Sequence, residues 1–60
     1  MEELLNRLKK YKEDADISYK QIAIETQIPF STFYNFSSGV RPLRKRYAEI
    51  LNQYLTAKGY

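Results

Sequence analysis

The apolar residues of the segment Ile17–Gly39 fall at a spacing that packs two short helices across a tight turn. Ser18 and Gln21 have the form of a capping box, in which the Ser18 side chain accepts from the Gln21 amide and the Gln21 side chain reaches back. The first of these helices should therefore begin at Ser18. It should end before Pro29, because proline disfavours the helical conformation in the residue that precedes it.

The second short helix is expected over about residues 29–37, with Phe33 and Phe36 facing inward. Gly39 follows, and glycine readily adopts the left-handed conformation that often ends a helix. Two helices of about eight residues, joined by about three, have the proportions of a helix-turn-helix, whose second helix lies in the DNA major groove.

Longer helices are expected on both sides of this pair. An apolar stripe over residues 2–13 comprises Leu4, Leu5, Leu8 and Tyr11. A second stripe, in a helix that should end near Ala57, comprises Leu43, Tyr47, Ile50, Leu51, Tyr54 and Leu55. Strand-like alternation, repeats and linkers are absent. We therefore predict one all-α domain over residues 1–60, with four helices or five.

Composition argues against several classes of function. The chain has no cysteine and no histidine, which removes the thiolate and imidazole groups of most metal and catalytic sites. Its seven acidic residues lie at predicted helix ends or in loops, and so short a chain builds no cleft of ligand size. No apolar run approaches the ~20 residues of a membrane span. We expect a cytoplasmic protein that is not an enzyme and has no metal, cofactor, small-molecule substrate or membrane partner.

Charge is distributed unevenly along the chain, whose net charge is +3. Residues 1–25 carry six acids and five bases, whereas residues 26–48 carry four bases and no acid. A field concentrated in one segment attracts a polyanion more strongly than the same charge spread evenly. A small basic domain of this kind is most simply interpreted as a nucleic-acid-binding protein.

Three short motifs occur together in this part of the chain: a Ser-x-x-Gln-Ile-Ala start at Ser18, an Ile-Pro-Phe-Ser-Thr turn at Ile28 and a Ser-Gly end at Ser38. Together they resemble the helix-turn-helix of the phage repressor and Cro (XRE-type) family, in the variants of Gram-positive bacteria and their phages. The resemblance implies a lambda-repressor-like fold and a transcription regulator of repressor or Cro type that binds double-stranded DNA in the nucleoid. It also implies a weak homodimer, for which apolar surface is expected at Tyr54, Leu55 and Tyr60.

Two residues depart from the family pattern. Gln27 occupies a turn position where the family usually has glycine, and a left-handed backbone there would cost glutamine about 1 kcal/mol relative to glycine. Tyr19 stands where the family often has a glutamine that contacts phosphate. Tyrosine can also donate a hydrogen bond, so Tyr19 remains an expected contact to the DNA backbone, together with its neighbours Ser18 and Lys20.

The outward face of the second short helix carries the residues expected to contact bases. At about 100° per residue, Ser31, Asn35 and Ser38 point away from the buried face, with Thr32 and Tyr34 on its shoulders. The Asn35 amide can bind adenine bidentately, hydroxyl groups can bond to several base edges, and aromatic rings can pack on thymine methyl groups. The expected base contacts are Phe30, Ser31, Thr32, Tyr34 and Asn35, and Ser38 is expected at the DNA backbone.

A simpler alternative exists for each of these residues. The polar side chains would form an ordinary solvated helix face, and Phe30 would belong to the core beside Phe33. The sequence leaves both alternatives open.

Basic residues follow this helix. Arg44, Lys45 and Arg46 fall in the first turn of the last helix, where the macrodipole disfavours cations by some tenths of a kcal/mol each. A basic run placed against the local dipole indicates a bound anion, so these residues and Arg41 are expected to hold phosphates beside the recognition helix. The alternative is a solubilising face. The lysines of residues 9–12 instead suit the C-terminal end of the first helix.

Two other functional interpretations stay open. In one, the scaffold is a protein-interaction module, such as an inhibitor or antitoxin, with aromatic anchors at Phe30, Tyr34, Tyr47, Tyr54 and Tyr60. The acid-free basic segment argues against it, because interface cores tend to exclude charge of both signs. In the other, the chain is the DNA-binding part of a larger repressor.

Overall fold

The computed structural model describes residues 1–60 and consists of four α-helices without a strand. The helices are α1 (Glu2–Ala15), α2 (Tyr19–Thr26), α3 (Phe30–Ser37) and α4 (Lys45–Ala57). This confirms the prediction of a small all-helical fold with four helices. The expected bounds hold closely, the main difference being that α1 continues past residue 13 to Ala15.

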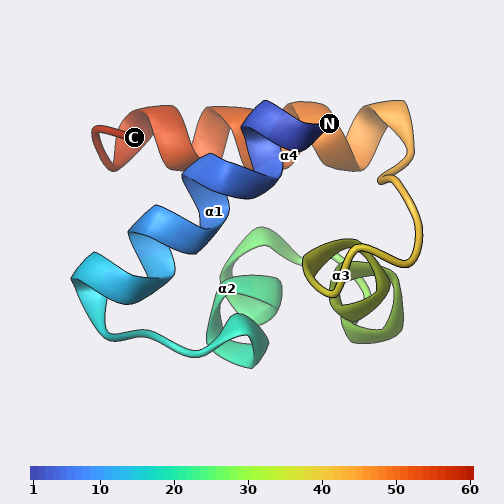
Figure 1. Cartoon of the computed structure of the whole chain (residues 1–60), viewed down its shortest axis with the longest axis horizontal. Helices are drawn as coiled ribbons and strands as arrows, with labels where there is room; N and C mark the ends of the chain where they lie inside the picture. Colours follow the sequence, from blue (N-terminus) through green and yellow to red (C-terminus); the bar gives the residue numbers. More distant parts are fainter.

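The helices are arranged with α1 against α4 and with α2 and α3 packed together beneath them (Figure 1). α1 descends from α4 to a corner, where a short connection leads into α2. Residues 27–29 join α2 to α3, and residues 38–44 return from α3 to the start of α4. No helix combines the length and the apolarity that a membrane span requires.

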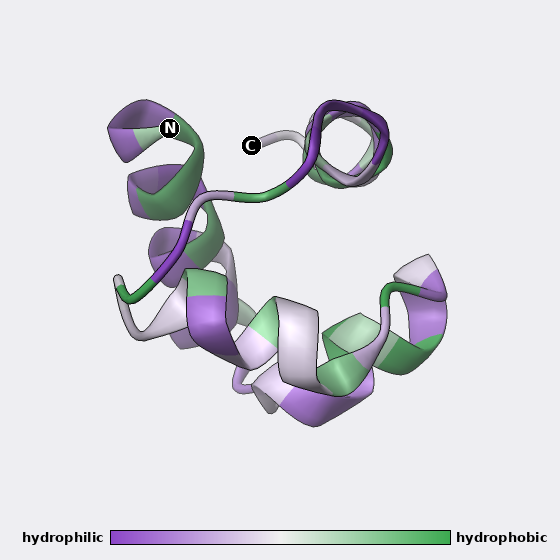
Figure 2. Ribbon diagram, turned by 90° about the vertical axis from the view of Figure 1, so that its right-hand side faces the viewer, coloured by the Kyte–Doolittle hydropathy of each residue, from purple (hydrophilic) through white to green (hydrophobic).

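The core contains ten buried apolar side chains, which come from all four helices and from both connections that flank α3. Phe33 is fully buried and Phe36 is 3% exposed, so the inward assignment of both residues is confirmed. In Figure 2 the helices carry both hydrophobic and hydrophilic residues, as expected for helices with one buried face. The remaining core residues are Leu8, Tyr11, Ile22, Ala23, Ile28, Leu43, Leu51 and Leu55.

The prediction that Tyr54, Leu55 and Tyr60 offer a free apolar surface for a homodimer is wrong. Leu55 is fully buried in the core of the single chain. The rings of Tyr54 and Tyr60 pack edge-on against Tyr11, with centroid distances of 5.8 and 5.3 Å. The chain therefore uses this apolar area to attach α4 to α1.

The helix ends of α2 and α3 follow the local expectations, with one exception. The Ser18 hydroxyl accepts a hydrogen bond from the Gln21 amide at 3.1 Å, as predicted. The Gln21 side chain does not return to Ser18 but donates to Glu25, one turn later, at 3.1 Å. The reciprocal half of the capping box is therefore wrong. It would need the Gln21 amide oxygen to accept from the Ser18 N–H, whereas the side chain is turned so that its NH2 group donates to a charged acceptor.

Residues with a left-handed backbone lie at or just after the end of all four helices, and Gly59 (φ 88°) is the one that follows α4. Gln27 has φ 60° and ψ 24°, which confirms the conformation expected at this turn. Gly39 has φ 79° and follows α3, as predicted. Asp16 ends α1 with φ 54°, a left-handed position that the sequence did not indicate.

Polar side chains also join helices that are distant in sequence. The Arg7 guanidinium donates to the Tyr60 backbone oxygen at 2.8 Å, to Asn52 Oδ1 at 2.6 Å and to Thr56 Oγ1 at 3.0 Å. The Tyr54 hydroxyl donates to Glu25 Oε1 at 2.6 Å and joins α4 to α2. Burial, followed by this hydrogen bond, raises the pKa of Tyr54 well above its usual range, and the same bond lowers the pKa of Glu25.

Candidate nucleic-acid interface

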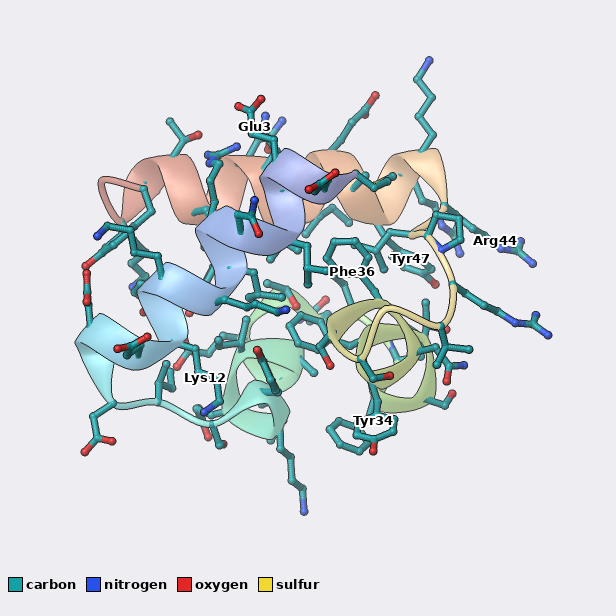
Figure 3. The ribbon with its side chains drawn as sticks, in the orientation of Figure 1. Glu3, Lys12, Tyr34, Phe36, Arg44 and Tyr47 are labelled. Carbon is teal, nitrogen blue, oxygen red and sulfur yellow. The ribbon has the colours of Figure 1, made fainter.

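The candidate surface is built on α3, which is fixed from behind by its buried side chains. Phe33 fills the core and lies 6.0 Å from the ring of Tyr19 on α2, measured between centroids. Figure 3 shows Phe36 directed into the molecule and Tyr34 projecting from it. The periodicity that buries Phe33 and Phe36 therefore presents the opposite face of α3 to solvent.

The five expected base contacts are all reachable from outside. Ser31 is exposed, and Thr32 and Asn35 are half-buried. Phe30 is 49% exposed and Tyr34 is 55% exposed. The core alternative for Phe30 is therefore wrong, because half of its surface faces solvent although Phe33 lies one turn away in the core.

The backbone and the side chain of Asn35 have different roles in the structure. Its backbone oxygen accepts hydrogen bonds from the amides of Val40 and Arg41, at 2.8 and 3.2 Å. These bonds fix the start of the α3–α4 loop against the end of α3. The side-chain amide of Asn35 makes no hydrogen bond within the chain, so both its donor and its acceptor are available to a ligand.

The two serines expected at the DNA backbone differ in what they can offer. Ser38 donates its hydroxyl proton to the Tyr34 backbone oxygen at 2.7 Å. Phosphate oxygens only accept hydrogen bonds, so Ser38 in this rotamer has no proton for them. Ser18 accepts from the Gln21 amide and keeps its hydroxyl proton free.

The start of α2 brings together two residues that the sequence treated separately. The Tyr19 ring is half-buried, and burial raises the pKa of its phenol, which therefore stays protonated and able to donate. The ammonium group of Lys12 lies 5.1 Å from the centroid of this ring, a cation–π contact. Figure 3 shows Lys12 at the corner between α1 and α2. Sequence reasoning assigned Lys12 only to the end of α1, because no local signal connects it to Tyr19 across the intervening turn.

The four basic residues after α3 are exposed, and none of them forms an ion pair. The one ion pair of the structure joins Lys10 to Asp14 at 4.0 Å, and both residues belong to α1. Arg44 precedes α4 as its N-cap without a side-chain capping bond, and the first turn of α4 contains no acid. Arg44 points away from the molecule in Figure 3. Arg46 packs its guanidinium on Tyr47, 4.8 Å from the ring centroid, and donates to its hydroxyl at 3.0 Å.

Lys45 has a different environment from its neighbours. It lines an open hollow of about 590 Å³ between α1 and α4, together with the carboxylates Glu3 and Glu49, so the expectation that so short a chain has no hollow of ligand size is wrong. Arg44 precedes the helix with an extended backbone, and the helical neighbours Lys45 and Arg46 point about 100° apart, so the three side chains do not form one cluster. Lys45 therefore has carboxylates nearby that Arg44 and Arg46 do not share, although none of the three forms an ion pair, and their phosphate contacts stay a prediction.

Comparison with protein-family models, with curated proteins and with solved structures finds no match to this chain. The resemblance to the phage repressor and Cro family thus stays a prediction from the motif.

Proposed function

We propose that the protein is a sequence-specific regulator of transcription that binds double-stranded DNA. In this proposal α2 and α3 form a helix-turn-helix, and α3 enters the major groove. The observation that carries the proposal is the accessible surface of residues 30–46, which presents an unpaired amide, hydroxyl groups, two aromatic rings and arginines, and contains no carboxylate. An α-helix with its side chains is ~10–12 Å in diameter, which fits a major groove ~12 Å wide.

Base recognition is assigned to the outward side chains of α3. The unpaired Asn35 amide can donate to adenine N7 and accept from adenine N6 at the same time, which no other base pair allows. Ser31 and Thr32 supply hydroxyl groups at the start of the helix. These residues lie on an element held rigid by Phe33, so their geometry is set before DNA arrives.

Phosphate binding is assigned to the two flanks of α3. Arg41 and Arg44 lie in the loop that Asn35 anchors, and Arg46 follows in the first turn of α4. Tyr19 and Lys20 lie on the other flank, at the start of α2. Contacts on both sides of a recognition helix fix its register on the duplex without reading sequence.

A protein-interaction module is the second candidate, because Phe30 and Tyr34 expose aromatic surface of the kind that interfaces use as anchors. Tyr54 and Tyr60, which seemed to offer further anchors, are instead packed on Tyr11. The arginines beside α3 favour a polyanionic partner over an apolar one. Salt separates the two functions, since phosphate contacts release counterions and an aromatic interface does not.

The test is the affinity for duplex DNA selected from a random pool, measured by fluorescence anisotropy over a range of salt concentrations. If about four phosphates are neutralised per chain, log K should fall with log salt at a slope of about −3 to −4. The double reversal Arg44→Glu and Arg46→Glu should abolish binding while the helical circular dichroism is kept.

The matched control reverses Lys9 and Lys10 to Glu, which changes net charge by the same amount on an exposed part of α1. It should weaken binding only slightly. Equal losses in the two double variants would show that net charge alone, and not the flank of α3, attracts the DNA. Absence of selection from the pool would contradict the proposed function itself.

A further inference from the structure

Phe30 and Tyr34 form a continuous aromatic surface at the start of α3. They are one helical turn apart, their ring centroids are separated by 5.9 Å, and their planes are inclined by 35°. Both rings are about half exposed. The Tyr34 hydroxyl makes no hydrogen bond within the chain, whereas the hydroxyls of Tyr54 and Tyr60 both donate to carboxylates.

Phe30 and Tyr34 belong neither to the buried core nor to the partly buried apolar residues packed against it. The core beneath α3 is closed by Phe33 and Phe36, and the rings of Tyr19, Tyr54 and Tyr60 are packed against core residues. Core packing therefore does not explain why two large aromatic rings lie side by side and exposed to solvent. Their surroundings favour a polyanionic partner. No carboxylate occurs between Glu25 and Glu49, and the nearby Arg41 and Arg44 form no ion pair.

We propose that the Phe30–Tyr34 pair recognises the C5 methyl groups of thymine in two consecutive A·T base pairs of the DNA site. This inference rests on the proposed function. The thymine methyl is the apolar group that a base pair presents in the major groove. Successive base pairs rise by ~3.4 Å, so two rings whose centroids are 5.9 Å apart reach the methyl groups of neighbouring pairs but not of distant ones.

In this assignment α3 contacts the bases in two ways, through hydrogen bonds and through apolar contact. Asn35, one residue after Tyr34, supplies hydrogen bonds, and the aromatic pair supplies shape and apolar contact at adjacent positions. The site should therefore contain two consecutive pairs whose identity depends on the methyl group and not on hydrogen bonding.

The experiment replaces each thymine of the selected site, one at a time, by deoxyuridine, which lacks the methyl group and pairs identically. For the wild-type protein, affinity should fall about fourfold at each of two adjacent positions, the loss expected for one buried methyl-sized group. Phe30→Ala and Tyr34→Ala should each make one of these two positions insensitive to the replacement. Circular dichroism verifies that both variants are folded.

Ile24→Ala is the matched control, because Ile24 is an exposed apolar residue on the neighbouring helix α2, 59% accessible. It should leave the full deoxyuridine effect at both positions. Selective binding with a flat deoxyuridine profile, or a profile that the two alanine variants do not alter, overturns the inference and leaves the proposed function standing. Failure to select any DNA overturns both.

Discussion

Gln27 holds a left-handed backbone conformation at the turn between α2 and α3, and Gln27→Gly should stabilise the protein. A left-handed conformation costs a residue with a Cβ atom roughly 1–2 kcal/mol. Glycine avoids this cost but loses more entropy on folding, by roughly 0.4–1 kcal/mol. The difference leaves a gain of about 0.5–1 kcal/mol in the free energy of unfolding.

No other interaction of Gln27 offsets this gain. Its side chain is exposed and makes no hydrogen bond, and its backbone amide donates to the Ile24 oxygen at 3.2 Å, a bond that glycine keeps. For a domain of this size the gain corresponds to a rise in melting temperature of about 2–8 °C. Thermal and urea unfolding followed by circular dichroism measure both quantities.

Asp16 provides an internal comparison, because it ends α1 with φ 54°. Aspartate tolerates the left-handed region better than glutamine does, so Asp16→Gly should give a smaller gain than Gln27→Gly. A lower melting temperature for Gln27→Gly, with an unchanged urea m-value, would refute the reasoning and show that strain at this turn is negligible.

Three further predictions follow from the structure. Asn35→Ala should reduce discrimination between the selected site and random DNA by about 1–3 kcal/mol while the melting temperature stays unchanged; intact discrimination would mean that another face of α3 reads the bases. Leu55→Asp should unfold the protein, because it places a charge in the core, and helical circular dichroism retained at 25 °C would contradict the burial of Leu55. The hydrogen bond from Tyr54 lowers the pKa of Glu25 from its ordinary 4.5. The ionised Glu25 carboxylate therefore stabilises the folded state above pH 4.5, and this stabilisation is lost as the pH falls through the lowered pKa of Glu25 in the folded protein. Glu25→Gln should flatten the pH dependence of urea unfolding in that acidic range, and an unchanged pH profile would show that Glu25 does not contribute to it.

Sequence reasoning succeeded where structure is determined by local chemistry. The burial of Phe33 and Phe36 follows from the helical spacing of apolar residues, and the end of α3 before Gly39 follows from the glycine. The left-handed turn at Gln27 was expected from the resemblance to the phage repressor and Cro family, which usually has glycine there. The outward direction of Asn35 and Tyr34 then follows from helical periodicity.

Contacts between distant segments could not be predicted in this way. The stripe that contains Leu55 indicates a helix with an apolar face, but the face could have bound a second chain as well as α1. The partners of Arg7 lie 45 to 53 residues away, so no spacing in the sequence indicates them. Phe30 was ambiguous for a related reason, since an aromatic residue at a helix start is covered or uncovered by whatever packs around it.

The bonds of Arg7 also bear on the order in which the protein folds. α2 and α3 are neighbours in the chain and meet across a short turn, whereas Arg7 must meet groups between residues 52 and 60. Loop closure costs more entropy for the longer separation, so local pairs form first. The α2–α3 pair should therefore assemble early, and the closure of α1 on α4 should come after the rate-limiting step. Loss of the Arg7 side chain would then accelerate unfolding and leave the folding rate almost unchanged.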